Sequence, residues 1–480
     1  MTLGEKDPNK INKTILLVGE TGAGKSTLIN ALVNYAMGVK WEDSVWFQIV
    51  EDERKSQCES QTSDVIVYEI FGFEDKTLPY SLTIIDTPGY GSTTGIEHDA
   101  IVCQRLFDLF RLDNGIHEIN AVGLVMKATD NRLSDRLRYI FDSVMSLFGK
   151  NMEKKIVILI THSDGLTPEN VLQALKDAKI KCAKDEENQP LHFMFNNRQS
   201  TERTRRNKFA LKSVWDVTME GMSQFTDFLK NTEPQNPEKT IEVLRAQIRL
   251  TACIQNLQER IVLTELKQRE IHQTQEALKN KEFTVEVDEP YKEKEPIHCG
   301  MWGLFFQGAV CCKKCEENCH YPGCTMAWKP GHCEVIKGGR CTSCTGKCPV
   351  SDHVKENWIY VTKTKRVKKT LHVNETGSEE KSSLLEDLKK KMEELQRETD
   401  QFLEESFNHI IKLEQNALKV NAVSTHVDLD LLIEKMKEKG DTEKVQKLEE
   451  IKRRMDEDEG TRSVRRYMST AGKVLTEVMK

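Results

Sequence analysis

One glycine-rich segment constrains this chain more than any other feature. Gly19-Glu-Thr-Gly-Ala-Gly-Lys-Ser26 follows the apolar run Thr14–Val18 and opens a stretch of helical periodicity, Ser26–Asn34. Glycines let the backbone turn successive N–H groups toward phosphate oxygens, and a helix N-terminus adds partial positive charge at the same place. The sequence therefore predicts a phosphate-binding loop between a strand and a helix.

Each residue of this loop has an expected role. Lys25 is expected to span the β- and γ-phosphates of a nucleotide, and the Ser26 hydroxyl to coordinate Mg²⁺. The other residues expected to contact the nucleotide here are Gly19, Glu20, Thr21, Gly22, Ala23, Gly24 and Thr27.

The region around the loop, from Lys13 to about Lys230, alternates between short apolar runs and amphipathic stretches. The predicted strands are 14–18, 64–68, 82–85, 121–126, 156–160 and 192–195, and the predicted helices are 26–34, 98–111, 134–148 and 168–178. This alternation indicates an α/β fold with a mostly parallel sheet covered on both faces. We expect the first domain to span residues 1–230.

A second candidate element, Asp86-Thr-Pro-Gly89, follows the predicted strand 82–85. An acid at a strand end can hold Mg²⁺ through water, and Gly89 can offer its N–H to the γ-phosphate. Between the two elements, the Thr62 hydroxyl is expected to complete the metal shell, with Ser60 and Ser63 as alternatives. The predicted magnesium ligands are therefore Ser26, Thr62 and Asp86.

Two further strand ends are expected to select the base. Asp164, in Thr161-His-Ser-Asp164, can accept from both N1–H and the exocyclic amine of guanine, a pair of donors that adenine lacks. Thr161 belongs to the same contact group, and His162 could lie under the base. Asn196 or Asn197, after the strand 192–195, could meet the guanine carbonyl. The expected ligand is GTP or GDP.

These residues resemble the septin-like and immunity-associated GTPases. The segments 18–30 and 86–91 look septin-like, whereas 125–134, 147–149, 161–164 and 195–197 look more like the immunity-associated type. The resemblance covers about 13–230. It implies a Ras-like P-loop GTPase fold, GTP/GDP binding with Mg²⁺, slow turnover, and dimers or filaments built across the nucleotide face. The usual Asn-Lys-x-Asp motif is Thr-His-Ser-Asp here, so only Asp164 carries over directly.

Slow hydrolysis also follows from Tyr90, which stands where a Ras-type enzyme keeps a glutamine to orient water. Arg105 is a candidate to stabilise charge in a second molecule, and an exposed structural arginine is the alternative. The predicted catalytic group is Lys25, Thr62, Gly89 and Arg105.

Cysteines mark a separate module. Ten of the 14 cysteines lie between Cys299 and Cys348. Their CxxC spacing, with nearby histidines, favours tetrahedral structural zinc, with disulfides, an Fe–S cluster or free thiols as alternatives. We expect about two zinc ions, without assigned pairs, held by Cys312, Cys315, Cys319, His320, Cys324, Cys333, Cys341, Cys344, Cys348 and His353.

The remaining segments divide at a polar hinge, 231–237. We expect a long helix over 238–281, then the cysteine–histidine module over 282–374 with flanking strands at 282–287 and 358–362, and a helical region over 378–480. A short heptad seam, 385–402, indicates that the long helices either pack simply or pair antiparallel as a stalk with the module at its tip.

Composition narrows the class of protein. The chain has 480 residues and 70 Lys+Arg against 76 Asp+Glu, so no overall charge favours a nucleic-acid partner. No apolar run reaches about 18 residues and the first ten residues are polar, so we expect a cytoplasmic protein without a membrane span.

Three functions fit the sequence. The first is a regulatory GTPase whose nucleotide state controls self-assembly or partner binding. The second is an adaptor that binds nucleotide without hydrolysing it and recruits protein partners through the helices or the module. The third is an ATP-driven enzyme with a nucleic-acid module, supported only by the basic run 363–369.

Overall fold

The computed structural model describes residues 1–50, 65–74, 76–88, 96–112, 115–130, 135–280, 284–297, 308–324, 329–371, 378–420 and 423–456. The chain divides into two compact units. The first combines 1–244 with 414–426 and the described residues from 450 onward, and the second combines 245–413 with 427–449. The region expected as one C-terminal helical part, 378–480, thus contributes to both units.

A seven-stranded sheet forms the centre of the first unit. Its strands lie in the order β1-β3-β4-β2-β5-β6-β7, and only the β3–β4 pairing is antiparallel. The strands are β1 (Thr2–Leu3), β2 (Asn12–Gly19), β3 (Ile66–Ile70), β4 (Ser81–Asp86), β5 (Ala121–Lys127), β6 (Ile156–Thr161) and β7 (His192–Met194). All six strands predicted from the apolar runs are present, and β1 is additional.

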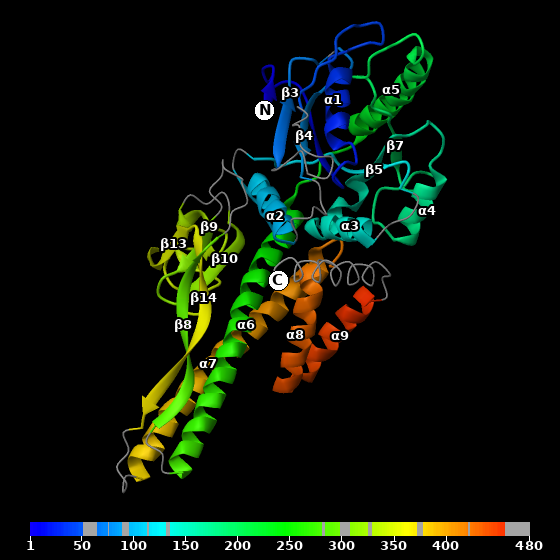
Figure 1. The fold of residues 1–480 in the computed structure, drawn as a ribbon. Helices are drawn as coiled ribbons and strands as arrows, with labels where there is room; N and C mark the ends of the chain where they lie inside the picture. Colours follow the sequence, from blue (N-terminus) through cyan, green and yellow to red (C-terminus); the bar gives the residue numbers. More distant parts are fainter. Residues whose placement is uncertain are drawn as a thin grey trace. The chain divides into compact units, whose positions relative to one another are not determined.

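Helices cover both faces of this sheet (Figure 1). They are α1 (Lys25–Ala36), α2 (Ile96–Arg111), α3 (Asp135–Leu147), α4 (Glu169–Asp177) and α5 (Lys208–Asn231). Ile15 and Leu17 of β2 pack with apolar residues of α1 and α5, among them Leu28 and Phe225. Because neighbouring strand residues point to opposite faces, the buried Leu16 faces the other layer. The predicted α/β fold is confirmed.

Two long helices organise the second unit. They are α6 (Glu238–Lys279) and α7 (Ser378–Asn416), followed by α8 (Val423–Lys439) and α9 (Thr442–Asp456). The Arg260 guanidinium lies 2.6 Å from Glu398, and the Cys253 thiol lies 3.6 Å from Glu405. As the chain advances along α6, its partner on α7 moves back, so the two helices pair antiparallel.

A long antiparallel ribbon connects the helices to the cysteine–histidine module. Strands β8 (Thr284–Pro296) and β14 (Trp358–Thr370) pair along their whole length. The module between them contains β9 (Gly308–Cys312), β10 (Glu317–Cys324), β11 (Ile336–Lys337), β12 (Arg340–Cys341) and β13 (His353–Glu356).

The module does not lie at the tip of the helix pair, so the alternative of a stalk with the module at its tip does not hold for the position of the module. Val285 and Val287 of the ribbon pack with Ala277, at the far end of α6. The module itself contacts the earlier part of that helix, where Asn256 donates to the carbonyl of Ser343. The ribbon therefore carries the module back along α6 (Figure 1).

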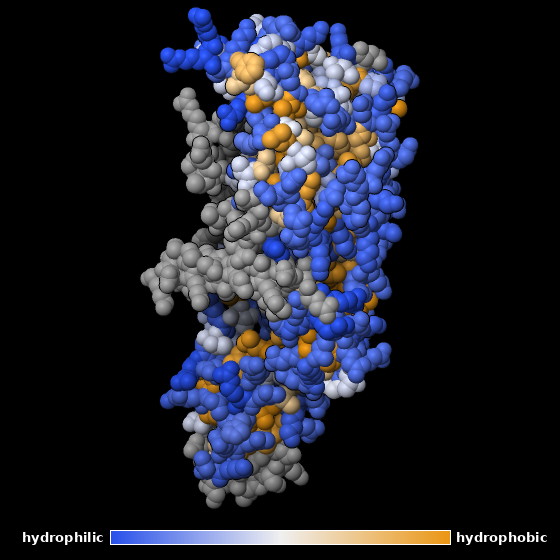
Figure 2. Space-filling view, turned by 90° about the vertical axis from the view of Figure 1, so that its right-hand side faces the viewer, coloured by the Kyte–Doolittle hydropathy of each residue, from blue (hydrophilic) through white to orange (hydrophobic). Residues whose placement is uncertain are grey.

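Figure 2 shows a face that is mostly hydrophilic, with hydrophobic residues in scattered small groups. None of the described helices is both long enough and apolar enough to span a bilayer.

Candidate functional site

The glycine-rich loop lies between β2 and α1, as predicted. Gly22 and Gly24 adopt left-handed φ angles of 78° and 93°, which glycine reaches without the steric cost that a side chain would bring. A Cβ atom on Gly24 would stand 3.4 Å from the Thr161 side chain. The backbone thus turns sharply before the N-terminus of α1, where Lys25 and Ser26 are the first two helical residues.

The Lys25 side chain folds back onto the glycine-rich loop. Its ammonium donates to the carbonyls of Gly19 at 2.9 Å and Glu20 at 3.2 Å, and the side chain is 7% exposed. Burial lowers the pKa of Lys25, while the nearby charges of Asp86 and Glu20 act in the opposite direction. Anionic phosphate oxygens at this loop would add to the charges that favour the protonated ammonium.

Asp86 stands beside this lysine because of sheet register. Strand β4 runs parallel to β2 with Asp86 opposite Leu17, two residues before Gly19. Asp86 is fully buried, and the Thr87 hydroxyl donates to the Leu17 carbonyl at 2.9 Å. The structure therefore brings the acid predicted to hold Mg²⁺ next to the phosphate loop.

Thr161 connects the phosphate loop to the predicted base loop. Its hydroxyl donates to the Ala23 carbonyl at 2.6 Å, and Thr161 is 2% exposed. The next residues differ in exposure: His162 and Asp164 are exposed, whereas Ser163 is buried. Thr161 thus connects the two loops on their buried side, whereas the exposed Asp164 side chain remains accessible to a base.

The end of β7 adjoins the same loop. The Asn196 side chain donates to the Ser163 carbonyl at 2.7 Å, so one of its two amide N–H groups already has an acceptor. The Asn197 side-chain nitrogen is buried without a hydrogen-bond partner among the described residues. Of the two predicted asparagines, Asn197 therefore retains more of the donor capacity that a guanine carbonyl requires.

Lys127 is a site residue that the sequence reasoning missed. It ends β5, and its ammonium lies 4.0 Å from the position a Cβ on Gly22 would take. Burial, then the charges of Lys127 and Arg198, lower the pKa of His162. A lysine at the carboxyl end of the strand beside β2 was the available signal, because ligands of such sheets gather at that edge.

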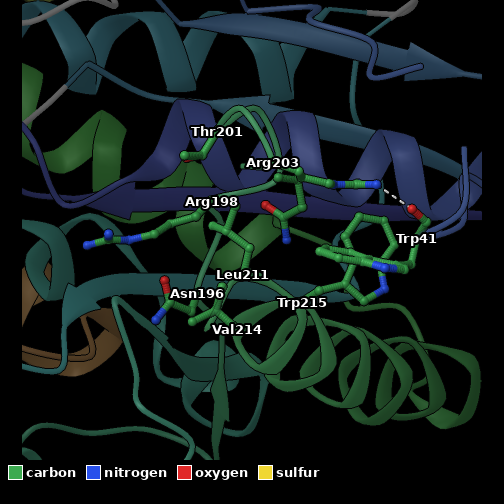
Figure 3. Close-up of a pocket in the computed structure, with 9 residues that line it drawn as sticks. Trp41, Asn196, Arg198, Thr201, Arg203, Leu211, Val214 and Trp215 are labelled. Atoms are coloured by element: carbon green, nitrogen blue, oxygen red, sulfur yellow. Dashed lines mark hydrogen bonds between the residues drawn. The ribbon is translucent and has the colours of Figure 1, made fainter. Parts of the chain in front are cut away.

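An aromatic cluster flanks the end of β7 (Figure 3). The Arg203 guanidinium lies over the Trp41 ring, 3.9 Å from its centroid, and donates to the Trp41 carbonyl. Trp215 meets Trp41 edge to face. Side chains fill the crevice between these residues, so it has no room for a water molecule. The cluster fixes the loop that follows Asn196 and Asn197.

The predicted catalytic group is only partly visible. Thr62 with its alternatives Ser60 and Ser63, together with Gly89 and Tyr90, lies outside the described residues. Arg105 lies on α2 and is 8% exposed. A buried guanidinium is not presented to a second molecule, so this conformation does not support the predicted role of Arg105 in trans, nor the alternative of an exposed arginine.

Comparison with known proteins agrees with this geometry. Residues 13–242 match the AIG1 family. This stretch is therefore similar to the AIG1 family. The match begins at β2 and ends early in α6, so it includes the phosphate loop, Asp86 and the base loop. The matched stretch contains strands β2 to β7 of the sheet and helices α1 to α5, and it leaves β1 and the second unit outside the match.

Septins are among the curated proteins to which this chain is similar. Septin-2 of Mus musculus is 35% identical over 94 residues, which are 20% of this chain and 21% of that protein. Septin-1 of Drosophila melanogaster is 26% identical over 182 residues, which are 35% of this chain and 44% of that protein. The chain thus spans less than half the length of these relatives.

Among solved structures, the chain is similar to Toc33 from Arabidopsis thaliana in complex with Mg²⁺ and GMPPNP. That chain is 16% identical, with a TM-score of 0.32, over 47% of this chain and 88% of Toc33. At this TM-score the likeness adds nothing to the fold described above.

Outside the stretch that matches the AIG1 family, the second unit gathers cysteines and histidines into three groups. The ligand atoms of each group lie within 4.8 Å of one another. The groups are Cys312, Cys315, Cys344 and Cys348; Cys319, Cys341, Cys344 and His353; and His320, Cys324 and Cys333. All ten residues predicted as zinc ligands belong to these groups, and none of the described cysteines forms a disulfide.

The surroundings of these groups suit metal ligands. The His353 Nδ1 atom lies 2.9 Å from the Pro349 carbonyl, which accepts when that nitrogen carries the proton. This tautomer leaves Nε2 as the free lone pair, and Nε2 is buried without a hydrogen-bond partner among the described residues. Backbone N–H groups point at sulfur as well: that of Cys315 at Cys312, and that of Cys348 at Cys344.

Buried ion pairs attach the module to α6. Arg260 pairs with Glu317 of β10, whose side chain is fully buried and also accepts from the Thr345 backbone at 2.8 Å. Arg245 and Arg249 both pair with Glu334, at 2.7 Å and 2.9 Å. These contacts hold the module to the helix within the second unit.

The basic run 363–369 is balanced across the ribbon. Lys363 pairs with Glu293 and Glu295, and further pairs join Lys365 to Glu289, Arg366 to Asp288 and Lys368 to Glu286. A cationic stripe for nucleic acid requires basic charge without nearby carboxylates. The basic run 363–369 was the one sequence feature that favoured a nucleic-acid module, and because it pairs with carboxylates it no longer supports that function.

Proposed function

We propose that this chain binds guanine nucleotide with Mg²⁺ and hydrolyses GTP slowly, and that its GTP or GDP state controls self-assembly or partner binding. The observation that carries the proposal is the convergence of Lys25, Ser26 and Asp86 on a glycine-rich loop fixed by left-handed backbone. In this arrangement Lys25 would neutralise phosphate charge, while Ser26 and Asp86 would hold the metal.

The preference for guanine rests on the base loop. Asp164 is exposed, and its Oδ1 accepts only from the Leu166 backbone within its own turn, at 2.9 Å. Its second oxygen could accept from guanine. The unpartnered Asn197 nitrogen supplies the complementary donor. Adenine presents the opposite pattern, with an acceptor at N1 and a donor at the exocyclic position.

Nucleotide selection can be tested directly on the purified chain. Nucleotide released by denaturation should be GTP or GDP by chromatography, and the recovery of ATP would refute the guanine assignment. Lys25→Ala should abolish retention. Asp164→Asn should shift preference from guanosine to xanthosine nucleotide, because the amide donates where the carboxylate accepts. An unchanged GTP affinity would remove Asp164 from the site.

The alternative function is an adaptor that binds nucleotide without turnover. It is favoured by the burial of Arg105 and by Tyr90 in place of glutamine. Phosphate release at several protein concentrations separates the two functions. A rate per molecule that rises with concentration supports assembly across the nucleotide face, whereas no release at any concentration supports the adaptor. Sizing with GDP and with a non-hydrolysable GTP analogue should show a larger species with the analogue.

We also propose that the cysteine–histidine module holds structural zinc and that the chain acts in the cytoplasm, where thiols stay reduced. Thiolate and imidazole groups at these spacings are the ligands that Zn²⁺ prefers. Bound zinc would cross-link the module in place of a hydrophobic core. The cysteines and histidines of the three groups would hold it in position.

A further inference from the structure

The thiol of Cys344 belongs to two ligand groups at once. It lies within 4.8 Å of Cys312, Cys315 and Cys348 in the first group, and of Cys319, Cys341 and His353 in the second. Cys344 therefore stands between the two groups and has neighbours on both sides.

The number of available ligands explains why the position of Cys344 between the two groups matters. Two four-coordinate zinc ions with separate ligands require eight donors, but the two groups together contain seven. If Cys344 served only the first ion, the second would keep only Cys319, Cys341 and His353. A thiolate sulfur has enough lone pairs to bind two ions, so sharing Cys344 completes both sites.

Distances within the groups fit tetrahedral coordination. Sulfur atoms around one zinc ion lie about 3.8 Å apart, given Zn–S bonds of about 2.3 Å. Cys315 and Cys348 have their sulfur atoms 3.6 Å apart, and Cys324 and Cys333 have theirs 3.8 Å apart. The atoms stand at the spacing that a central ion would set.

The third group is separate from this pair. His320 Nδ1 lies 3.1 Å from the Cys333 sulfur, and no residue of this group occurs in the other two. Among the described residues, no fourth cysteine, histidine or carboxylate joins it. It nonetheless brings two thiols and an imidazole together in a buried place, which is enough to retain an ion.

We propose that the module binds three zinc ions, two of which share the Cys344 thiolate as a bridging ligand, and that the third is held by His320, Cys324 and Cys333. Each thiol releases its proton on binding. The inference rests on the proposal that the module holds zinc, and it corrects the expected count of about two ions.

Metal counting on the intact chain tests the proposal. Elemental analysis of the purified protein should give about three zinc ions per chain. Cys344→Ser removes a ligand from two sites at once, so two ions per chain should pass to a chelator more readily than they do from the native protein. Cys333→Ser leaves the third group two ligands, and this variant should keep about two ions. Cys311→Ser is the matched control: Cys311 is buried in the same module but belongs to none of the three groups, so this variant should keep all three.

Cadmium replacement keeps the test decisive if Cys344→Ser fails to fold. ¹¹³Cd spectra of the unmutated chain should show three resonances, two of them split by coupling through the shared sulfur. Resonances without splitting would overturn the bridge, and two ions per chain would overturn the count of three; both results leave structural zinc intact. A chain that purifies without any zinc would refute the zinc proposal itself, and none of these results depends on nucleotide binding.

Discussion

At the scale of single residues, the Thr161 hydroxyl joins two loops that are 138 positions apart in the sequence. One loop is expected to hold the phosphates and the other the base. Because both ends of the nucleotide contact this pair of loops, the spacing between them should affect affinity even though Thr161 is buried behind them.

Thr161→Val should therefore weaken nucleotide binding without touching the nucleotide. A hydrogen bond of this kind contributes about 0.5–1.5 kcal/mol, which corresponds to roughly 2- to 10-fold in affinity. Thr161→Ser restores the hydroxyl and should restore binding. Calorimetric titration with GDP measures both variants, and equal affinities for Val and Thr at this position would contradict the proposed support.

A second residue-scale prediction concerns Asp428 on α8. Burial raises the pKa of Asp428 to about 7. The folded state then binds the proton more tightly than the unfolded chain does, so this group favours folding below about pH 4 and that contribution is lost as the pH rises to 7. Asp428→Asn is neutral throughout and should be more stable than the native chain at pH 8, by at most about 4 kcal/mol.

Denaturant unfolding at pH 4 and pH 8 measures this difference. The two proteins should have similar stability at pH 4, where both side chains are neutral. A native chain that gains stability relative to Asp428→Asn as the pH rises would show that Asp428 is ionised and paired in the folded state.

At the scale of elements, charged pairs differ greatly in what they contribute. The pair between Arg260 of α6 and Glu317 of β10 has side chains only 8% and 0% exposed. The pair between Lys368 and Glu286 on the ribbon has side chains 76% and 50% exposed, at 3.2 Å. Water screens the second pair but not the first.

Glu317→Gln should destabilise the second unit by about 1–3 kcal/mol, because the buried Arg260 guanidinium loses one of its two carboxylate partners and keeps Glu398. Lys368→Ala should leave the unfolding midpoint nearly unchanged, since exposed pairs contribute less than about 1 kcal/mol. Thermal unfolding compares the two variants. A larger loss for Lys368→Ala would reverse this ranking.

The elements also show what the sequence could and could not predict. Apolar β-branched runs such as 156–160 identified the buried strands, because a strand covered on both faces needs few polar residues. The ribbon strands were predicted only over 282–287 and 358–362, since their charged residues hide the rest of each strand. Helix α5 was missed although Leu211, Trp215, Met222 and Phe225 follow a helical period.

The residues of the candidate sites also differ in whether the sequence alone could predict them. Lys25 and Asp86 could be predicted because their spacing relative to a strand end determines their position. The role of Thr161 could not, because its partner Ala23 is reached only when β6 and the loop after β2 come together. The sharing of Cys344 likewise depends on two ligand groups meeting in space, and ligand spacing alone does not reveal it.

At the scale of the whole molecule, the first unit is completed by a late segment of the chain. The Leu418 N–H donates to the Phe148 carbonyl at 2.8 Å, and Lys419 pairs with Asp142 at 2.5 Å. Lys150 and Lys181 donate to the carbonyls of Glu414 and Leu418. Residues 414–419 are thus an integral part of this unit.

Lys419→Met should destabilise the first unit by about 3–5 kcal/mol, because Asp142, with its side chain 3% exposed, loses the cation that pairs with it at 2.5 Å. Unfolding followed with and without GDP measures the effect, since bound nucleotide stabilises only the folded unit. Lys419→Arg keeps the charge and is the control. Equal stability of Met and native chains would show that residues 414–419 are held by the backbone contacts alone.

This late closure has a consequence for how the protein is made. A ribosome that has finished Leu244 must add about 170 further residues before Glu414 emerges, which takes roughly 10–30 seconds at common rates of translation. During that interval the nucleotide-binding sheet can form, but Phe148 and Asp142 remain without their final partners. Nucleotide bound to the nascent chain would then stabilise the partly completed unit until residues 414–419 have been synthesised.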